Sequence, residues 1–186
     1  MSARVVLGMA GASGAALGLS VARQLAGLGA EVDLVISAPA QRNLALECGE
    51  GALKRLRESV SRFHPIADIG AAIASGSAPV AGMIVAPCSM RSLAAIAMGL
   101  DDNLLTRAAS VQLKERRALV LLAREAPLSL AHLRNMTQAT EMGAIILPPV
   151  PAFYLAPRSL DDIIDQIAAR AIDQLRIAAP LATAWR

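Results

Sequence analysis

Short apolar runs separated by helix-like segments constrain the fold of this chain most strongly. Five such runs cover residues 4–9, 31–36, 82–86, 118–123 and 144–147. A run without polar alternation is typical of a strand that is buried on both faces. Strands that alternate with helices predict a parallel sheet between two helical layers. The 186 residues are enough for one domain with a full core, so we expect a single α/β domain over 1–186.

The segments between the runs predict the helices. We expect helices up to Leu28, from Pro39 to about Glu47, and over 53–62, 91–98, 103–116 and 129–142. Ser159 starts the last helix, with Asp162 placed three residues later as in a capping box. The proline-rich stretch 148–151 predicts a stiff loop.

Composition excludes several classes of protein. Hydrophobic residues make up 55% of the chain, yet no apolar run reaches the roughly 18 residues of a membrane span. We therefore interpret the excess hydrophobicity as subunit interface in a homo-oligomer. The net charge of +3 with only 2% aromatic residues argues against nucleic-acid binding and favours small anionic ligands.

The two cysteines, Cys48 and Cys88, show no metal-type spacing, so no disulfide scaffold or metal site is expected. We see no signal peptide and expect a cytoplasmic protein.

Unusual residues gather where the predicted strands end, and ligands bind at that edge of a parallel sheet. The segments are 11–13, 37, 87–91, 124–125 and 148–154. The first loop, from Gly8 to Gly18, is rich in small residues that let backbone amides approach a phosphate at a helix N-terminus. Its spacing is not that of a dinucleotide fingerprint, and Ser37 stands where a ribose-binding carboxylate would be needed. A mononucleotide or flavin phosphate fits better, and a turn that binds nothing is the alternative.

In the second turn, 86–92, Ser89 and Ser92 fit simple helix capping, and Cys88 is better explained as a buried thiol than as a nucleophile.

Between 103 and 125 the charged residues occur at ordered positions. Arg107 and Lys114 are seven residues apart, which places them on one face of a helix. Arg124 and Glu125 follow a buried strand and suggest an anion site with proton chemistry.

Other charged residues have simpler interpretations. Glu47 alone is typical of a solvated helix end. Arg170 falls on the apolar stripe of the last helix, where it either extends to the surface or points into a phosphate site. His64 and His132 lack recognisable partners and are interpreted as structural.

Several ordered strings resemble the UbiX/Pad flavin prenyltransferases, a group that includes the B subunits of hydroxyarylic acid decarboxylases. They are Gly11-Ala-Ser-Gly14, Ala86-Pro-Cys-Ser-Met90, Asp102-Asn-Leu-Leu-Thr-Arg-Ala-Ala109, Leu113-Lys-Glu-Arg-Arg117, Arg124-Glu-Ala-Pro127 and Pro148-Pro-Val-Pro-Ala-Phe-Tyr154. The resemblance runs through nearly the whole chain.

The resemblance implies a Rossmann-like (flavodoxin-like) three-layer sandwich that assembles into a homo-oligomer, usually a dodecamer, with the site at a subunit junction. It also implies metal-independent transfer of the dimethylallyl group from dimethylallyl phosphate to N5 and C6 of reduced FMN. The product, prenylated FMN, is the cofactor of UbiD-type decarboxylases, which would receive it.

The resemblance also implies roles for particular residues. FMN contacts match Gly11, Ala12, Ser13, Ser37, Ser89, Met90, Arg91, Ser92 and Arg124, with Arg107 near the site. Contacts to dimethylallyl phosphate match Ser13, Lys114, Arg124, Tyr154 and Arg170, with Trp185 close by. The catalytic group comprises Glu47 and Glu125 for proton handling, together with Lys114 and Ser13.

Two positions depart from the family pattern. Leu17 stands where an aromatic residue is frequent, and Ala38 where lysine is frequent. The first leaves Tyr154 and Trp185 as the expected aromatic walls of a prenyl pocket. Three alternatives remain at this point: a non-catalytic FMN-binding accessory subunit, a flavin-dependent cysteine or phosphopantothenoylcysteine decarboxylase, and a generic dinucleotide-binding protein.

Overall fold

One parallel sheet forms the centre of the molecule. The computed structural model describes residues 2–185, and the predicted domain bounds, 1 and 186, lie outside that part. The strands are β1 (Arg4–Met9), β2 (Glu31–Ile36), β3 (Arg62–His64), β4 (Gly82–Cys88), β5 (Ala118–Ala123) and β6 (Ile145–Ile146). They are ordered β3-β2-β1-β4-β5-β6, and every neighbouring pair is parallel.

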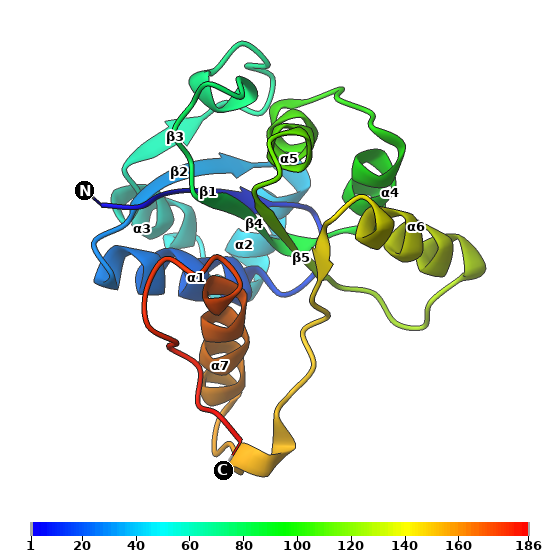
Figure 1. Ribbon diagram of the computed structural model, residues 1–186. Helices are drawn as coiled ribbons and strands as arrows, with labels where there is room; N and C mark the ends of the chain where they lie inside the picture. Colours follow the sequence, from blue (N-terminus) through cyan, green and yellow to red (C-terminus); the bar gives the residue numbers. More distant parts are fainter. Residues whose placement is uncertain (1, 186) are drawn as a thin grey trace.

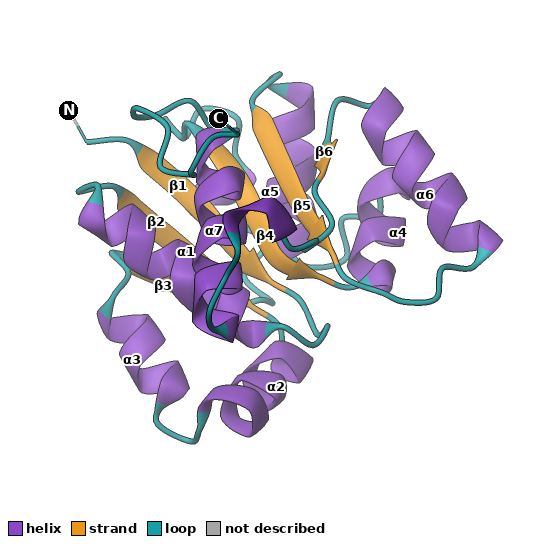
Figure 2. Cartoon of the chain, turned by 90° about the horizontal axis from the view of Figure 1, so that it is seen from below, coloured by secondary structure: helices purple, strands orange, loops and turns teal. Residues whose placement is uncertain are grey.

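Helices cover both faces of the sheet, which confirms the predicted three-layer α/β fold (Figures 1 and 2). One face carries α1 (Ala15–Gly27), α2 (Ala38–Cys48), α3 (Ala52–Glu58) and α7 (Leu160–Asp173). The other carries α4 (Met90–Met98), α5 (Leu104–Lys114) and α6 (Leu130–Glu141). Two short 3-10 turns, Ala72–Ala74 and Phe153–Leu155, lie in the connections.

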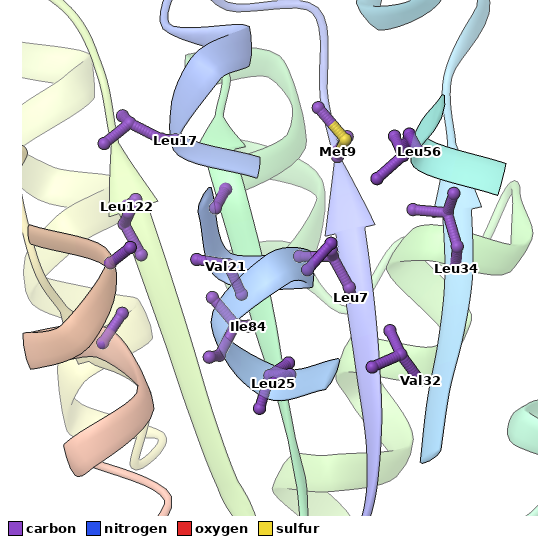
Figure 3. Close-up of a cluster of buried hydrophobic side chains, with 14 of the residues drawn as sticks. Leu7, Met9, Leu17, Val21, Leu25, Val32, Leu34, Leu56, Ile84 and Leu122 are labelled. Atoms are coloured by element: carbon purple, nitrogen blue, oxygen red, sulfur yellow. The ribbon is translucent and has the colours of Figure 1, made fainter. Parts of the chain in front are cut away.

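The unbroken apolar strands are explained by burial on both sides. Side chains alternate along a strand, so Leu7 faces the α1 and α7 layer, whereas Val6 faces the α4 and α5 layer. Figure 3 shows Leu7, Ile84 and Leu122 from three neighbouring strands beneath helix α1. A strand with two buried faces has no position for a polar side chain unless that side chain finds a buried partner.

Strand β3 was not predicted. We expected a helix over 53–62, but α3 ends at Glu58 and Arg62–His64 pairs with β2. Its three residues contain a single apolar side chain, Phe63, so no apolar run reveals the strand. Without β3 the order would be the flavodoxin order 2-1-3-4-5, and with β3 it is the Rossmann order 3-2-1-4-5-6.

Both histidines have partners, contrary to expectation, and both have a structural role. His64 Nε2 lies 2.7 Å from Asp33 Oδ1. His132 Nδ1 accepts a hydrogen bond of 3.2 Å from the backbone N–H of Ser129, which completes a capping box at the start of α6. The predicted capping box at Ser159 and Asp162 is also present.

Apolar side chains are exposed on an arm that projects from the sheet. The arm comprises residues 148–158 and the C-terminal segment 180–185, which lie close together in Figure 1. Phe153 and Trp185 are 76% and 73% exposed, and Val150 is 67% exposed. This surface is consistent with the predicted subunit interface. Within residues 2–185, no helix is both long and apolar enough to cross a membrane.

Asp33 is the charged residue buried most deeply in the sheet, with no solvent exposure. Arg4 on β1 donates to it through Nε at 2.6 Å and Nη2 at 3.0 Å, and His64 lies on its other side. Burial alone would raise the pKa of Asp33. The hydrogen bonds from Arg4 and His64 outweigh that effect and hold the pKa below its usual value. This ionic cluster therefore ties together the strands β1, β2 and β3.

We predict that Asp33→Asn lowers the free energy of unfolding by about 3 kcal/mol, because it leaves Arg4 without its buried counter-charge. Urea unfolding at pH 7 measures the loss, and Asp68→Asn is the control at an exposed position. The depressed pKa means that the ionised carboxyl stabilises the fold at higher pH and that this contribution disappears as the pH falls through the folded-state value. The difference between wild type and variant should therefore shrink below about pH 4. A pH-independent difference would contradict the prediction.

Candidate functional site

The carboxyl ends of β1, β2 and β4 border a cleft of about 360 Å³. This volume falls within the range of about 300–1,000 Å³ that is usual for small-molecule sites. The lining residues are Gly11, Ser37, Pro39, Ile66, Ser89, Arg91, Ser92, Asn103 and Leu105. Five of them, Gly11, Ser37, Ser89, Arg91 and Ser92, are among the residues assigned to cofactor binding from the sequence. The cleft therefore collects residues from three loops that are far apart in the chain.

One face of α2 shapes the loop that follows β1. A Cβ at Gly11 would lie 2.5 Å from Cβ of Pro39, so only glycine fits there. Four residues after Pro39, the side chain of Asn43 donates through Nδ2 to the carbonyl oxygen of Ala12 at 3.1 Å. Four residues further, Glu47 reaches the start of α1. The i, i+4, i+8 spacing explains why these three side chains share one helix face.

Glu47 is exposed at the end of α2, as interpreted from the sequence, and it also caps helix α1. Its Oε2 atom accepts hydrogen bonds from the N–H groups of Gly14 at 2.9 Å and Ala15 at 2.7 Å. Gly14, the N-cap residue, has no side chain that could do this. The expected phosphate position at the N-terminus of α1 is thus partly taken by a carboxylate from the same chain.

The loop itself keeps unpaired donors. Within residues 2–185 no acceptor is found for the N–H groups of Gly11, Ala12 and Ser13, and the side chain of Ser13 is exposed without a hydrogen bond. Consecutive free amides form a concave donor surface that suits an anion or a ring carbonyl. The first loop therefore remains a candidate ligand loop, through residues 11–13 rather than through α1.

Helix α4 has a more open N-terminus. Ser89 accepts from the N–H of Ser92 at 3.3 Å, as capping predicts, whereas no acceptor is found within the described residues for the N–H groups of Met90 and Arg91. The Arg91 guanidinium lies at the same place and pairs with Asp102. Serine hydroxyls, free amides and a guanidinium at a positive helix end form a donor set that fits a phosphate.

Cys88 is not a nucleophile, in agreement with the sequence interpretation. It is completely buried, and burial raises the pKa of its thiol to about 12. The thiolate that nucleophilic attack needs is therefore absent near neutral pH.

Arg124 and Glu125 lie beside the cleft. The N–H of Arg124 donates to the carbonyl oxygen of Cys88 at 3.1 Å, which aligns the end of β5 with the end of β4. Both side chains are exposed. No ion pair of Arg124 is found among residues 2–185, so its guanidinium is available to an anion.

Lys114 lies at the opposite edge of the sheet. It ends α5, four residues before β5 begins at Ala118, whereas Arg124 follows the other end of that strand. The six-residue strand spans about 20 Å. Lys114 pairs with Glu115 next to Gly76, and Arg107 pairs with Asp101 at 3.0 Å. Within one chain, Lys114 and Arg124 do not form the common site that their closeness in sequence suggested.

Tyr154, Trp185 and Arg170 lie outside the cleft as well. The rings of Tyr154 and Trp185 meet edge to face with centroids 4.7 Å apart on the arm. Arg170 is exposed, and its Nη1 atom lies 3.9 Å from Oδ2 of Asp173. Its assignment to the apolar stripe of α7 was wrong, because the buried positions Ile167–Ala169 and Ala171–Ile172 leave residue 170 on the outer side. Leu17 is buried in the core, with 4% exposure.

Sequence reasoning missed Asn43, Asp102 and Asn103. Asp102 holds Arg91, and Asn103 lines the cleft and caps α5 by accepting from the N–H of Thr106 at 3.1 Å. The four-residue spacing of Pro39, Asn43 and Glu47 places these residues on one face of α2. The sequence did not show that this face contacts the loop after β1.

Known proteins match along the whole chain. A family model described as Flavoprotein matches residues 1–172. The flavin prenyltransferase UbiX of Thauera aromatica is 50% identical over 182 residues, which cover 98% of this chain and 93% of that protein. The chain belongs to the UbiX flavin prenyltransferase family.

Two solved UbiX-type structures have the same fold. AnUbiX (PadA1), crystallised in complex with FMN and dimethylallyl pyrophosphate, superposes with a TM-score of 0.95 at 44% identity and covers 100% of this chain and 98% of its own. A dodecameric FMN-dependent UbiX-like decarboxylase from Escherichia coli O157:H7 gives a TM-score of 0.93 at 42% identity, with 98% and 99% coverage. The family resemblance found in the sequence is thus confirmed by the fold.

The geometry of this UbiX family member divides the predicted site residues into two groups. Gly11, Ala12, Ser13, Ser37, Glu47, Ser89–Ser92, Arg124 and Glu125 lie at or beside the carboxyl edge of the sheet. Arg107, Lys114, Tyr154, Arg170 and Trp185 lie on α5, on α7 and on the arm. Within one chain, the structure does not gather the two groups in one cleft.

We predict that Glu47→Ala lowers the free energy of unfolding by about 1 kcal/mol, because α1 loses its cap. Glu47→Gln should cost only about 0.5 kcal/mol, since its amide oxygen still accepts from Gly14 and Ala15 and only the charge is lost. Denaturant unfolding measures both, with Glu50→Ala as the control on an exposed neighbour. Equal losses for Glu47→Ala and Glu50→Ala would show that the cap contributes nothing.

Proposed function

We propose that this protein is a flavin prenyltransferase that joins the dimethylallyl group of dimethylallyl phosphate to N5 and C6 of reduced FMN. The observation that carries the proposal is the cleft at the ends of β1, β2 and β4, with free amides and hydroxyls on its walls and Arg124 and Glu125 at its side. The relatives that share the fold and almost half of the sequence support the same activity.

The cleft residues fit FMN by their chemistry. The free amides of Met90 and Arg91, the Arg91 guanidinium and the hydroxyls of Ser89 and Ser92 suit its phosphate. The donors of Gly11–Ser13 suit polar atoms of the ring system, and Ser37 adds a hydroxyl from the end of β2. Reduced FMN supplies the nucleophilic nitrogen and carbon of the reaction, so the protein has to bind the flavin and activate the prenyl donor.

Cations of the chain stabilise the leaving group. Departure of phosphate from an allylic carbon creates a carbocation and a strong anion. In the proposal, Arg124 binds that anion at the cleft, and Lys114 and Arg170 of neighbouring copies complete the binding site. The hydroxyl of Tyr154 donates a further hydrogen bond to it, as does the exposed hydroxyl of Ser13.

Carboxylates handle the proton that leaves C6 when the new ring closes. Glu125 is exposed beside Arg124, and within residues 2–185 the one hydrogen bond found for its carboxylate comes from the N–H of Ala126, at 3.1 Å. Glu47 uses Oε2 for the two amides of α1, and no partner of Oε1 is found within residues 2–185, so that oxygen remains open to a reacting group. Either carboxylate is suited to accept a proton.

The aromatic pair of the arm protects the carbocation. Water would trap an allylic cation, so the prenyl chain needs an apolar enclosure. Tyr154 and Trp185 present ring faces and edges that are exposed in a single chain. When they cover the cleft of a neighbouring copy, they exclude water and stabilise positive charge by cation–π interaction.

The proposed site is therefore shared between copies of the chain. Each copy supplies a cleft and, at a distance from it, the cations and aromatic rings for another copy. We propose a homo-oligomer, a dodecamer by analogy with the UbiX-like structure described as dodecameric. A UbiD-type decarboxylase is the proposed recipient of the prenylated flavin.

The alternatives receive less support from the structure. A histidine at the flavin would favour a cysteine decarboxylase, but His64 is bound to Asp33, and neither His64 nor His132 lines the cleft. A non-catalytic FMN carrier would not need Lys114, Arg124 and Arg170, since it has no leaving phosphate to stabilise.

We predict that purified protein incubated without oxygen with reduced FMN and dimethylallyl phosphate increases the flavin mass by one C5 unit. Mass spectrometry of the extracted flavin measures the product. Arg170→Ala should still bind FMN but lose turnover by about 10²–10³-fold, as expected for loss of one donor to a developing anion. Unchanged flavin with the wild-type protein would favour the carrier, and full activity of Arg170→Ala would remove that residue from the phosphate site.

We predict that two inactive variants complement each other. Arg124→Ala removes the guanidinium that binds the leaving phosphate in the proposal, whereas Arg170→Ala removes a group supplied to another copy. Refolding the two chains together in equal amounts should restore activity to about a quarter of wild type, because random assembly leaves that share of sites intact when two copies form each site. Refolding each variant alone is the control. Activity that stays at the level of the separate variants would contradict a shared site.

A further inference from the structure

We propose that Asn43 is a positioning residue that holds the ligand loop after β1 in its donor-presenting conformation. This inference rests on the proposed binding of FMN at the cleft. It assigns a specific task to a side chain that itself lies outside the cleft lining. The contact that carries it is the hydrogen bond from Asn43 Nδ2 to the carbonyl oxygen of Ala12 at 3.1 Å, which joins α2 to the middle of the loop.

Peptide geometry explains why one hydrogen bond to Ala12 affects Ser13. The carbonyl of Ala12 and the N–H of Ser13 belong to the same planar, trans peptide unit and point in opposite directions. Asn43 fixes the carbonyl towards α2. The N–H of Ser13 must therefore point away from α2, and it is one of the unpaired donors of the loop.

The loop has no other restraint of this kind. Ala10 is tied to β4 by its N–H bond to the carbonyl oxygen of Pro87 at 3.0 Å, and Gly14 is tied to Glu47. Between these two anchors, the hydrogen bond from Asn43 is the one restraint found on Gly11–Ser13 in the described part of the chain. Pro39 limits the loop sterically from the same helix face.

Loss of this restraint should weaken ligand binding without unfolding the protein. Asn43 is only partly buried, so truncation of its side chain leaves no cavity in the core. The loop would then sample conformations in which the peptide between Ala12 and Ser13 is turned. A net hydrogen-bond contribution of the usual size corresponds to about three- to tenfold in the population of the bound conformation.

The test measures FMN affinity by fluorescence titration of the intact oligomer, together with the melting temperature of the unliganded protein. Asn43→Ala and Asn43→Asp should both raise the Kd for FMN about three- to tenfold, with melting temperatures close to wild type. The carboxylate in Asn43→Asp has the size of the amide but donates no hydrogen bond. Asn43→Gln keeps the donor and should recover part of the affinity. Arg42→Ala is the control at the neighbouring, exposed position of α2.

Wild-type affinity in Asn43→Ala or Asn43→Asp would overturn the proposal. The proposal would also be overturned if both variants had a raised Kd together with a clearly lowered melting temperature, and Asn43→Gln recovered neither. That result would show a general loss of structure. The readout is binding, so it remains valid if the wild-type protein binds FMN but fails to transfer a prenyl group. That result would refute the proposed function and leave the role of Asn43 standing.

Discussion

Parallel strands impose one direction on the whole molecule, and the site depends on that direction. The chain leaves every strand at the same edge, so the ends of β1, β2, β4 and β5 meet although they are up to 114 residues apart in sequence, from Met9 to Ala123. The same rule separates groups that are close in sequence. Lys114 precedes β5 and Arg124 follows it, so the backbones of these two residues lie beyond opposite ends of a strand about 20 Å long. A site that needs both has to be assembled from more than one copy.

The parts of the fold that could be predicted are those that depend on local sequence. The runs 4–9, 31–36 and 118–123 coincide with β1, β2 and β5, because strands buried on both faces are mainly apolar; the buried Asp33 of β2 is tolerated because Arg4 and His64 bond to it. Ser159 and Asp162 cap α7 as expected, since a capping box is complete within four residues. The three-residue strand β3 was missed because its pairing with β2, rather than its composition, makes it a strand.

The positions of the predicted site residues in space could be foreseen only in part. Gly11, Ser37, Ser89 and Arg91 do share a cleft, because each follows a strand of the same sheet. The role of Glu47 in capping α1 was not visible, since it depends on how α2 packs against a loop more than thirty residues earlier. The outward position of Arg170 depends in the same way on which side of α7 faces α1. Contacts between elements are set by packing, which a single sequence does not report.

Several cations assigned to the site from the sequence form ion pairs with carboxylates of the same chain. In the proposed site these cations do the work that a metal ion would otherwise do. In one chain Lys114 pairs with Glu115, Arg107 with Asp101 and Arg170 with Asp173. The hydrogen bond from Lys114 lowers the pKa of Glu115, so that carboxylate stays charged. Exposed pairs of this kind contribute little to stability, because water competes with them. In the proposed site, a phosphate would replace these partners, since it offers more oxygens and more charge. Arg124 has no such partner within the described residues, and its backbone N–H is bonded to Cys88, next to the cleft residue Ser89.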